Sequence, residues 1–381
     1  MSIAKPKSVD QTIAQFDVSE DRFATHLRAH VNRFFPDLDT STTTVRLTDH
    51  VVRRYSQLLQ YEVADASVVF RVIYKIPFSL QDTMTARTTI GERPRLFPIV
   101  CPVSNGLREY RALKSLQQHY SSLKDCRFGA ISVFDLIESP FVVVMQKCPD
   151  PDLKLLLKRS TRFHRIRNKE TLNQAFENTG AWLREFHKLP TLEHTEQRHE
   201  DRSCFVDSVK RFAEGLSQQT GNRSLFHDIS QRLAESAQRI LPVKLPCAII
   251  HGDFAPRNIL VRADSRVTVF DTQRRWRAPL YEDLAYLLIS IKAPGPQVRS
   301  QGVLFKRSQL ASWESAFLNG YFLNTRIPLA TVRLYECLLT LEWWAAINFR
   351  HRDGNLRERF GLKLSNRYLS RYMQSLLSDI E

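Results

Sequence analysis

The segment from residue 248 to residue 285 constrains the fold of this chain more than any other stretch of the sequence. It opens with three apolar residues, continues with His251-Gly252-Asp253, and places Asn258 five positions after Asp253. Two short apolar runs separated by a polar turn then lead to Asp271. Such a pattern predicts a strand, a loop and a tight hairpin. This arrangement would bring the side chains of Asp253, Asn258 and Asp271 to one point.

Two carboxylates and an amide that meet at one point suit phosphoryl transfer. One carboxylate can orient the attacking hydroxyl, while the amide oxygen and the second carboxylate can hold the metal ion that accompanies nucleotide phosphates. We therefore predict Asp253 as the catalytic residue, and Asn258 and Asp271 as metal ligands that also help to bind the nucleotide. The alternative is a β-hairpin whose acids only cap turns, and the combined pattern disfavours it.

The pattern HGDxxxxN, followed by a hydrophobic hairpin and an Asp, resembles the catalytic core of aminoglycoside phosphotransferases, choline kinases and related small-molecule kinases. Residues 279–285 resemble the DPxYDLA segment of this family, although Ala278 replaces the first Asp and the spacing is one residue longer. The resemblance implies that Asp283 and His251 support the catalytic loop, and that ATP and Mg²⁺ are the cofactors. It also implies an α+β, bilobal protein-kinase-like fold, with a small, mostly antiparallel β N-lobe and a larger helical C-lobe.

Two further residues match the nucleotide site of the family. Residues 68–76 are rich in β-branched side chains and predict a strand with Lys75 near its end. Residues 105–120 predict a helix in which Glu109 shares a face with two leucines, so its carboxylate would need a cation. The resemblance implies that Glu109 holds Lys75 against the nucleotide phosphates. For each residue the alternative of a solvated surface position stays open.

Two features depart from the pattern of the family. The sequence has no glycine before Gly91, so a phosphate-covering loop, expected near residues 48–56, would work without one. Gln273 stands where the family usually has an acid, two residues after Asp271. These departures favour the alternative function of a catalytically weak, kinase-like binding or scaffold protein, whereas the intact Asp253, Asn258 and Asp271 disfavour it.

The 381 residues are enough for two lobes that each have a core. We predict an N-terminal helical extension at residues 1–44, within which residues 21–36 have apolar side chains at helical spacing. A nucleotide-binding N-lobe is predicted at residues 45–148. The catalytic and acceptor-binding helical C-lobe would follow at residues 149–381, after a proline-containing segment that predicts the boundary.

The chain carries a net charge of +15, most of it after residue 150. A basic excess favours anionic partners such as phosphorylated sugars or a lipid surface, although a solvated basic face would look the same. Arg274, Arg275 and Arg277 follow the predicted metal ligand, and guanidinium groups bind phosphate or carboxylate in a two-pronged way. We predict these three as acceptor-binding residues, and an acceptor that is neutral or anionic rather than a polycation such as an aminoglycoside.

The sequence therefore predicts an ATP-dependent phosphotransferase that acts on a hydroxyl of a small molecule or glycan. A nucleic-acid-binding protein is the other rival, because the pI of about 9.7 permits it, but no binding motif is recognisable. No secretory signal and no run of ~20 apolar residues are present, and the six cysteines have no CxxC spacing. These features predict a cytoplasmic protein without a transmembrane segment, and they leave open a peripheral contact with anionic lipid or glycan.

Overall fold

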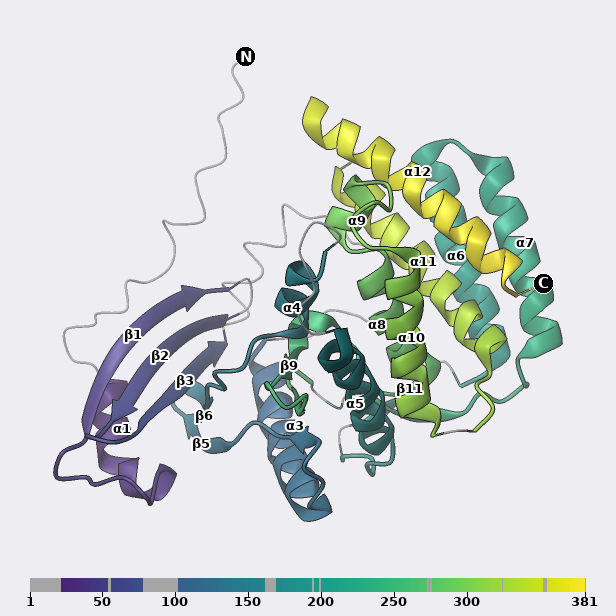
Figure 1. The fold of residues 1–381 in the computed structure, drawn as a ribbon. Helices are drawn as coiled ribbons and strands as arrows, with labels where there is room; N and C mark the ends of the chain where they lie inside the picture. Colours follow the sequence, from purple (N-terminus) through teal and green to yellow (C-terminus); the bar gives the residue numbers. More distant parts are fainter. Residues whose placement is uncertain are drawn as a thin grey trace.

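The computed structural model describes most of the chain, namely residues 22–53, 56–77, 102–161, 169–193, 195–198, 200–272, 274, 276–323, 325–351 and 355–380. Figure 1 shows an N-terminal sheet on one side and a larger group of helices on the other. The predicted α+β class, with a mostly antiparallel sheet followed by a helical region, is confirmed. Within the described residues, no helix is both long enough and apolar enough to cross a membrane.

The N-terminal sheet has five antiparallel strands in the order β1-β2-β3-β6-β5. Their bounds are Thr44–Val52 (β1), Ser56–Ala64 (β2), Val69–Pro77 (β3), Val133–Glu138 (β5) and Phe141–Gln146 (β6). The turn between β2 and β3 forms around Asp65, whose carboxylate accepts hydrogen bonds from the backbone N–H groups of Ser67 and Val68. The first three strands therefore form a meander, and Lys75 lies near the end of its third strand.

Two helices cover the opposite faces of this sheet. Successive side chains of β6 alternate between them: Val142 and Val144 pack toward α1 (Arg22–Phe34), and Val143 packs toward α3 (Pro102–Leu123). The amphipathic helix predicted near the N-terminus is confirmed as α1, and its apolar side chains are buried against the sheet. In Figure 1, α3 lies between the sheet and the C-terminal helices. It therefore contacts both parts of the molecule.

The C-terminal part is built mainly from helices. They are α4 (Leu153–Arg159), α5 (Lys169–His187), α6 (Arg202–Thr220), α7 (Arg223–Ile240), α8 (Tyr281–Lys292), α9 (Gly295–Arg299), α10 (Arg307–Phe322), α11 (Leu329–His351) and α12 (Leu356–Ser378). Helices α5 and α10 cross at two glycines: a Cβ atom at Gly180 would lie 2.0 Å from the carbonyl oxygen of Phe317, and one at Gly320 would lie 1.9 Å from that of Glu177. Larger side chains at these two positions would push the helices apart.

The segment from Lys147 to Asp152 joins β6 to α4. The domain limits 1–44, 45–148 and 149–381 remain predictions.

Short strands frame the segment that contains the HGDxxxxN pattern. The predicted hairpin is confirmed, because β9 (Ile259–Val261) pairs antiparallel with β10 (Val267–Val269). The strand before the loop, β8 (Cys247–Ile250), pairs antiparallel with β11 (Trp276–Pro279). The two remaining short strands, which pair in parallel with β10 and β11, are β4 (Phe128–Gly129) and β7 (Glu196–Gln197).

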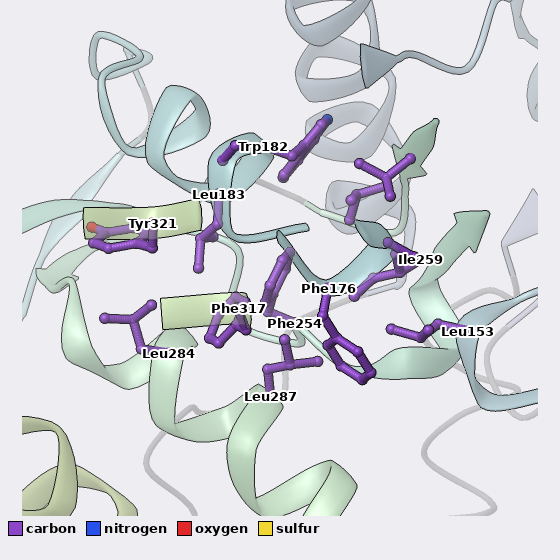
Figure 2. Close-up of a cluster of buried hydrophobic side chains, with 14 of the residues drawn as sticks. Leu153, Phe176, Trp182, Leu183, Phe254, Ile259, Leu284, Leu287, Phe317 and Tyr321 are labelled. Carbon is purple, nitrogen blue, oxygen red and sulfur yellow. The ribbon is translucent and has the colours of Figure 1, made fainter. Parts of the chain in front are cut away.

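A buried aromatic core lies directly beneath this segment (Figure 2). Phe254, the residue after Asp253, has no exposed surface, and its ring centroid lies 6.1 Å from Trp182 and 6.4 Å from Phe317. Ile259, the residue after Asn258, is also fully buried in this core. Because Phe254 and Ile259 are anchored in the core, the loop has little freedom to move. Packing therefore holds the adjacent polar residues, Asp253 and Asn258, in place.

Candidate active site

The loop before Asp253 is fixed by the carboxylate of Asp283, near the start of α8. Oδ2 of Asp283 accepts a hydrogen bond of 2.6 Å from the backbone N–H of His251, and Oδ1 accepts one of 3.0 Å from that of Gly252. Gly252 has a φ of +80°, which favours glycine even though there is room for a Cβ atom beside Trp276. The structure therefore brings Asp283 and His251 together, as the sequence predicts.

Asp283 is in turn held by a buried pair that sequence reasoning did not assign. Nε2 of His187, at the end of α5, lies 3.1 Å from Oδ2 of Asp283, and its Nδ1 lies 2.7 Å from the hydroxyl of Tyr321 on α10. The side chain of Asp283 is only 2% exposed, so the charge of this carboxylate is balanced by hydrogen bonds rather than by water. The loop is thereby tied to helices α5, α8 and α10 at once.

Asp253 and Asn258 are in direct contact. The side-chain amide of Asn258 donates hydrogen bonds of 2.9 Å and 3.0 Å to the backbone oxygen and to Oδ2 of Asp253. Because the amide nitrogen must face these acceptors, the amide oxygen of Asn258 is directed elsewhere and remains able to bind a cation. The side chain of Asp253 is 33% exposed, so an external hydroxyl can approach it.

Lys75, Glu109 and Asp271 meet although they come from three different elements. The Lys75 ammonium lies 2.7 Å and 2.6 Å from the two carboxylate oxygens of Glu109 on α3, and 3.4 Å from Oδ1 of Asp271 at the end of the hairpin. Burial alone would lower the pKa of Lys75, but the two carboxylates outweigh burial and raise it. The Lys75 ammonium in turn lowers the pKa of Asp271. Both groups are therefore charged at neutral pH.

Two backbone contacts join these groups into one site. The backbone N–H of Phe270, which precedes Asp271, donates a hydrogen bond of 3.1 Å to the backbone oxygen of Asn258. The backbone oxygen of Phe270 lies 3.0 Å from Nε2 of His251. The loop that holds Asp253 and the hairpin that ends at Asp271 are consequently locked together.

This donor set fits a nucleotide that carries Mg²⁺. The amide oxygen of Asn258 and the carboxylate of Asp271 are hard oxygen ligands of the type that Mg²⁺ prefers. The side chain of Asp271 is 46% exposed, so one oxygen can contact Lys75 while the carboxylate stays open to solvent. The ammonium of Lys75 adds a fixed positive charge that phosphate oxygens can use.

Residues 160–324 match the model of the phosphotransferase enzyme family, which covers the segment from the end of α4 to the end of α10. The resemblance to this family is confirmed. A search of curated protein sequences gives no match.

Solved structures of small-molecule kinases are similar to the whole chain. An ethanolamine kinase from Plasmodium vivax has 10% identity and a TM-score of 0.51, and the match covers 94% of this chain and 90% of that chain. A choline kinase from Streptococcus pneumoniae has 10% identity and a TM-score of 0.46, with 94% and 99% covered. A macrolide 2'-phosphotransferase from Brachybacterium faecium has 11% identity and a TM-score of 0.47, with 91% and 98% covered. The likeness to the ethanolamine kinase confirms the protein-kinase-like fold.

The predicted acceptor-binding role does not fit the position of Arg274. Its side chain has no exposed surface, and its guanidinium donates hydrogen bonds to the hydroxyl of Ser115 on α3 and to the backbone oxygen of Pro190. Burial lowers the pKa of Arg274 to about 10. Arg277 on β11 is partly exposed and donates a hydrogen bond of 3.0 Å to Gln197. Arg275 lies outside the described residues.

The structure places a different arginine beside Asp253. Arg257 forms an ion pair with Oδ1 of Asp253, and its side chain is 48% exposed. The hydroxyl of Tyr286 on α8 hydrogen-bonds to both residues. Burial and the charge of Asp253 raise the pKa of Tyr286, so its hydroxyl keeps its proton. The signal for Arg257 lies within the HGDFAPRN segment itself, four residues after Asp253, where sequence reasoning did not single it out.

Glu282, beside Asp283, offers a prediction of pH dependence. Its side chain is buried, its Oε2 has no hydrogen-bond partner among the described residues, and burial raises its pKa to about 8. In an unfolded chain the pKa of glutamate is about 4.3. Between this pH and the higher pKa of buried Glu282, the folded state binds one proton more than the unfolded state. Stability should therefore fall as the pH rises through this window. We expect Glu282→Gln to leave the melting temperature nearly unchanged at pH 5 and to raise it by several degrees at pH 8.5.

Thermal unfolding of both proteins across this pH range is the measurement. Glu214→Gln, at an exposed position of α6, controls for the change from Glu to Gln itself. If the difference in melting temperature between Glu282→Gln and the parent stays constant from pH 5 to pH 8.5, Glu282 is not buried in its protonated form.

Proposed function

We propose that this protein is an ATP- and Mg²⁺-dependent phosphotransferase that acts on a hydroxyl group of a small molecule or glycan. The observation that carries the proposal is the meeting of the Lys75–Glu109–Asp271 cluster with the Asp253–Asn258 pair in one site. The match of the surrounding segment to the phosphotransferase enzyme family supports the same reaction class. When bound, ATP would supply the phosphoryl group and Mg²⁺ would neutralise charge on its phosphates.

In this proposal Asp253 orients the acceptor hydroxyl and takes its proton. Its fixed position above the aromatic core and its contact with Asn258 would hold the carboxylate in one orientation. Asn258 and Asp271 would hold Mg²⁺, and Lys75 would bind the phosphates while Glu109 keeps its ammonium in place. Catalysis would then come from positioning and from charges that are arranged before the reaction starts.

We further propose that the acceptor is neutral or anionic, and that Arg257 rather than Arg274 contributes to its recognition. The guanidinium of Arg257 pairs with Asp253, so it places a positive charge beside the carboxylate that the acceptor hydroxyl must reach. This charge would repel a polycation. An anionic group on the acceptor could instead accept hydrogen bonds from Arg257, which would leave Asp253 free to take the proton.

The test is a phosphate-transfer screen with ATP against phosphorylated sugars, neutral sugars, lipopolysaccharide-core fragments, amino alcohols and aminoglycosides. We expect turnover of a neutral or anionic acceptor. If that acceptor is anionic, Arg257→Gln should lower its kcat/KM by about 10- to 100-fold, because one charge-assisted contact is lost. Arg257→Lys keeps the charge but not the two-pronged geometry, so it should recover only part of this loss.

The matched control is Arg262→Gln, which removes one positive charge from the hairpin turn, where Arg262 pairs with Asp264. It should leave kcat/KM unchanged. Efficient phosphorylation of kanamycin-like polycations, without turnover of any neutral or anionic compound, would contradict the proposed acceptor class and leave the phosphotransferase activity standing.

A catalytically weak binding or scaffold protein is the second candidate, and the connection between β1 and β2 favours it. This connection contains no glycine, and its residues 54 and 55 lie outside the described residues. Binding of ATP with Mg²⁺ and no turnover of any compound in the screen would support this candidate.

The proposal of a phosphotransferase also includes a cytoplasmic location and peripheral contact of the basic C-terminal part with anionic lipid or glycan.

A further inference from the structure

A second group of possible ligands lies on the face of the N-terminal sheet opposite to Lys75. Tyr74 and Lys75 are neighbours on β3, and their side chains point to opposite faces: Tyr74 packs against α1, whereas Lys75 meets Glu109 on α3. On the α1 side, His26, His30 and Asp135 each offer one ligand atom, and these atoms all lie within 4.8 Å of one another.

The two histidines are four residues apart, so they lie on the same face of α1. Their rings are close, with centroids 4.4 Å apart. Asp135 comes from β5, the strand at the edge of the sheet, and its Oδ1 accepts a hydrogen bond of 3.0 Å from the backbone N–H of Leu136. This contact fixes the orientation of the carboxylate, so that Oδ2 faces α1.

The contacts of the two Nδ1 atoms are compatible with metal binding through Nε2 of each ring. Nδ1 of His30 lies 2.8 Å from the backbone oxygen of His26, and because a carbonyl oxygen can only accept, Nδ1 must carry the proton. Nδ1 of His26 lies 2.9 Å from the hydroxyl of Tyr74, which can accept the corresponding proton. With both Nδ1 atoms protonated, Nε2 of each ring bears the lone pair that a metal ion requires, and a bound ion would then lie between Nε2 of His26 and Oδ2 of Asp135. Hydrogen bonds from the second nitrogen to protein oxygens are the usual support of metal-binding histidines.

The separation of the ligand atoms also suits an ion. Nε2 of His26 lies 3.3 Å from Oδ2 of Asp135. Two ligands at ~2.0–2.1 Å from a tetrahedral Zn²⁺ are separated by ~3.3 Å, so these two atoms already have the required separation. Arg33 contacts Oδ2 of Asp135 as well, and with a side chain that is 54% exposed it can move into solvent.

We propose that His26, His30 and Asp135 bind a divalent transition-metal ion of the Zn²⁺ type, with a fourth position left to water. Two imidazoles and one carboxylate suit Zn²⁺ far better than Mg²⁺ or Ca²⁺, which prefer oxygen ligands. The ion fastens α1 to β5, and through the contact of His26 with Tyr74 it braces the strand that carries Lys75. The alternative is an ion-pair network of His26, Arg33 and Asp135 that binds no metal.

The experiment uses the full chain, stripped of metal with a chelator and then titrated with Zn²⁺ by calorimetry and in thermal unfolding. We expect Zn²⁺ to bind the parent and to raise its melting temperature by several degrees, because the ion binds only the folded site. His30→Ala and Asp135→Asn should each abolish this increase. His227→Ala, at an exposed position of α7, removes an unrelated histidine and should retain the full increase.

Two further arms separate this site from the phosphotransfer site. Mg²⁺ alone should give no comparable increase, and Asp271→Asn should respond to Zn²⁺ as the parent does. If Asp135→Asn does not fold, the parent loaded with Co²⁺ still provides the test, since a tetrahedral site gives strong visible absorption bands and a six-coordinate, octahedral site does not. The proposal is overturned if the parent binds no Zn²⁺, if Zn²⁺ stabilises His30→Ala as much as the parent, or if the Co²⁺ form lacks these bands.

Discussion

Replacing Asp253 by asparagine is expected to lower kcat by roughly 10²- to 10⁴-fold and to leave the fold and the affinity for ATP almost unchanged. An amide has nearly the shape of a carboxylate but cannot take the proton of the acceptor hydroxyl. The loop should keep its conformation, because the backbone N–H groups of His251 and Gly252 are bound by Asp283 and not by the side chain of Asp253. The side chain of Asp253 is also partly exposed, so its charge contributes little to packing.

The measurement combines steady-state kinetics on the acceptor found in the screen with thermal unfolding and ATP titration. Asp264→Asn, in the exposed turn of the same hairpin, removes one carboxylate of the same lobe and should retain full activity. Turnover of Asp253→Asn within a few-fold of the parent would refute the assignment of Asp253 as the catalytic base. A collapse of the melting temperature would instead mean that the ion pair with Arg257 holds the loop.

Sequence reasoning worked best where the functional residues are close in sequence or lie on elements with a strong period. Asp253 and Asn258 are five residues apart, and the apolar residue that follows each, Phe254 or Ile259, anchors the loop and the hairpin. Lys75 and Glu109 could be paired because each lies on an element with a clear period. Strand alternation gives the direction of the Lys75 side chain, and the apolar face of the helix gives that of Glu109. The contact of Lys75 with Asp271 depends on how the two lobes pack, and no local pattern predicts it.

The arginines after Asp271 show where such reasoning fails. This segment has no hydrophobic period, and both Asp271 and Arg274 have positive φ angles, of 66° and 46°. Positive φ at a residue other than glycine depends on the surrounding structure and cannot be predicted from propensity. The chain therefore turns Arg274 into the interior, whereas a run of charged residues predicts exposure. Arg257 gives no signal of its own, because it occupies a position of the HGDxxxxN pattern at which no residue type is specified.

The sequence indicates only part of the group formed by His26, His30 and Asp135. The spacing of the two histidines on an amphipathic helix is visible there, and their place on one face follows from it. Asp135 lies more than a hundred positions later, and it approaches them only because β5 is paired with β6 and α1 covers that face of the sheet. Long-range register of this kind is not contained in any local pattern.

Replacing Asp271 by asparagine is expected to abolish the binding of nucleotide that depends on Mg²⁺, and with it all measurable turnover. Asparagine is the suitable substitution because Asp271 has a φ of 66°, a conformation that asparagine tolerates and alanine adopts only with strain. The variant loses the charge that would bind Mg²⁺ and also one of the two carboxylates near Lys75, while the contact of Lys75 with Glu109 remains. The fold should persist, since the side chain of Asp271 is nearly half exposed.

The measurement is the increase in melting temperature that ATP produces with Mg²⁺ and with a chelator in its place. For the parent, the increase should be several degrees larger with Mg²⁺, because a ligand that binds only the folded state stabilises it in proportion to its affinity. For Asp271→Asn, the two increases should be equal and small, and Asp264→Asn should behave as the parent. If ATP with Mg²⁺ stabilises Asp271→Asn as much as the parent, Asp271 does not bind the metal ion. The positive charge of Lys75 would then be the main attraction for the phosphates, and Lys75→Met should be the variant that loses the nucleotide.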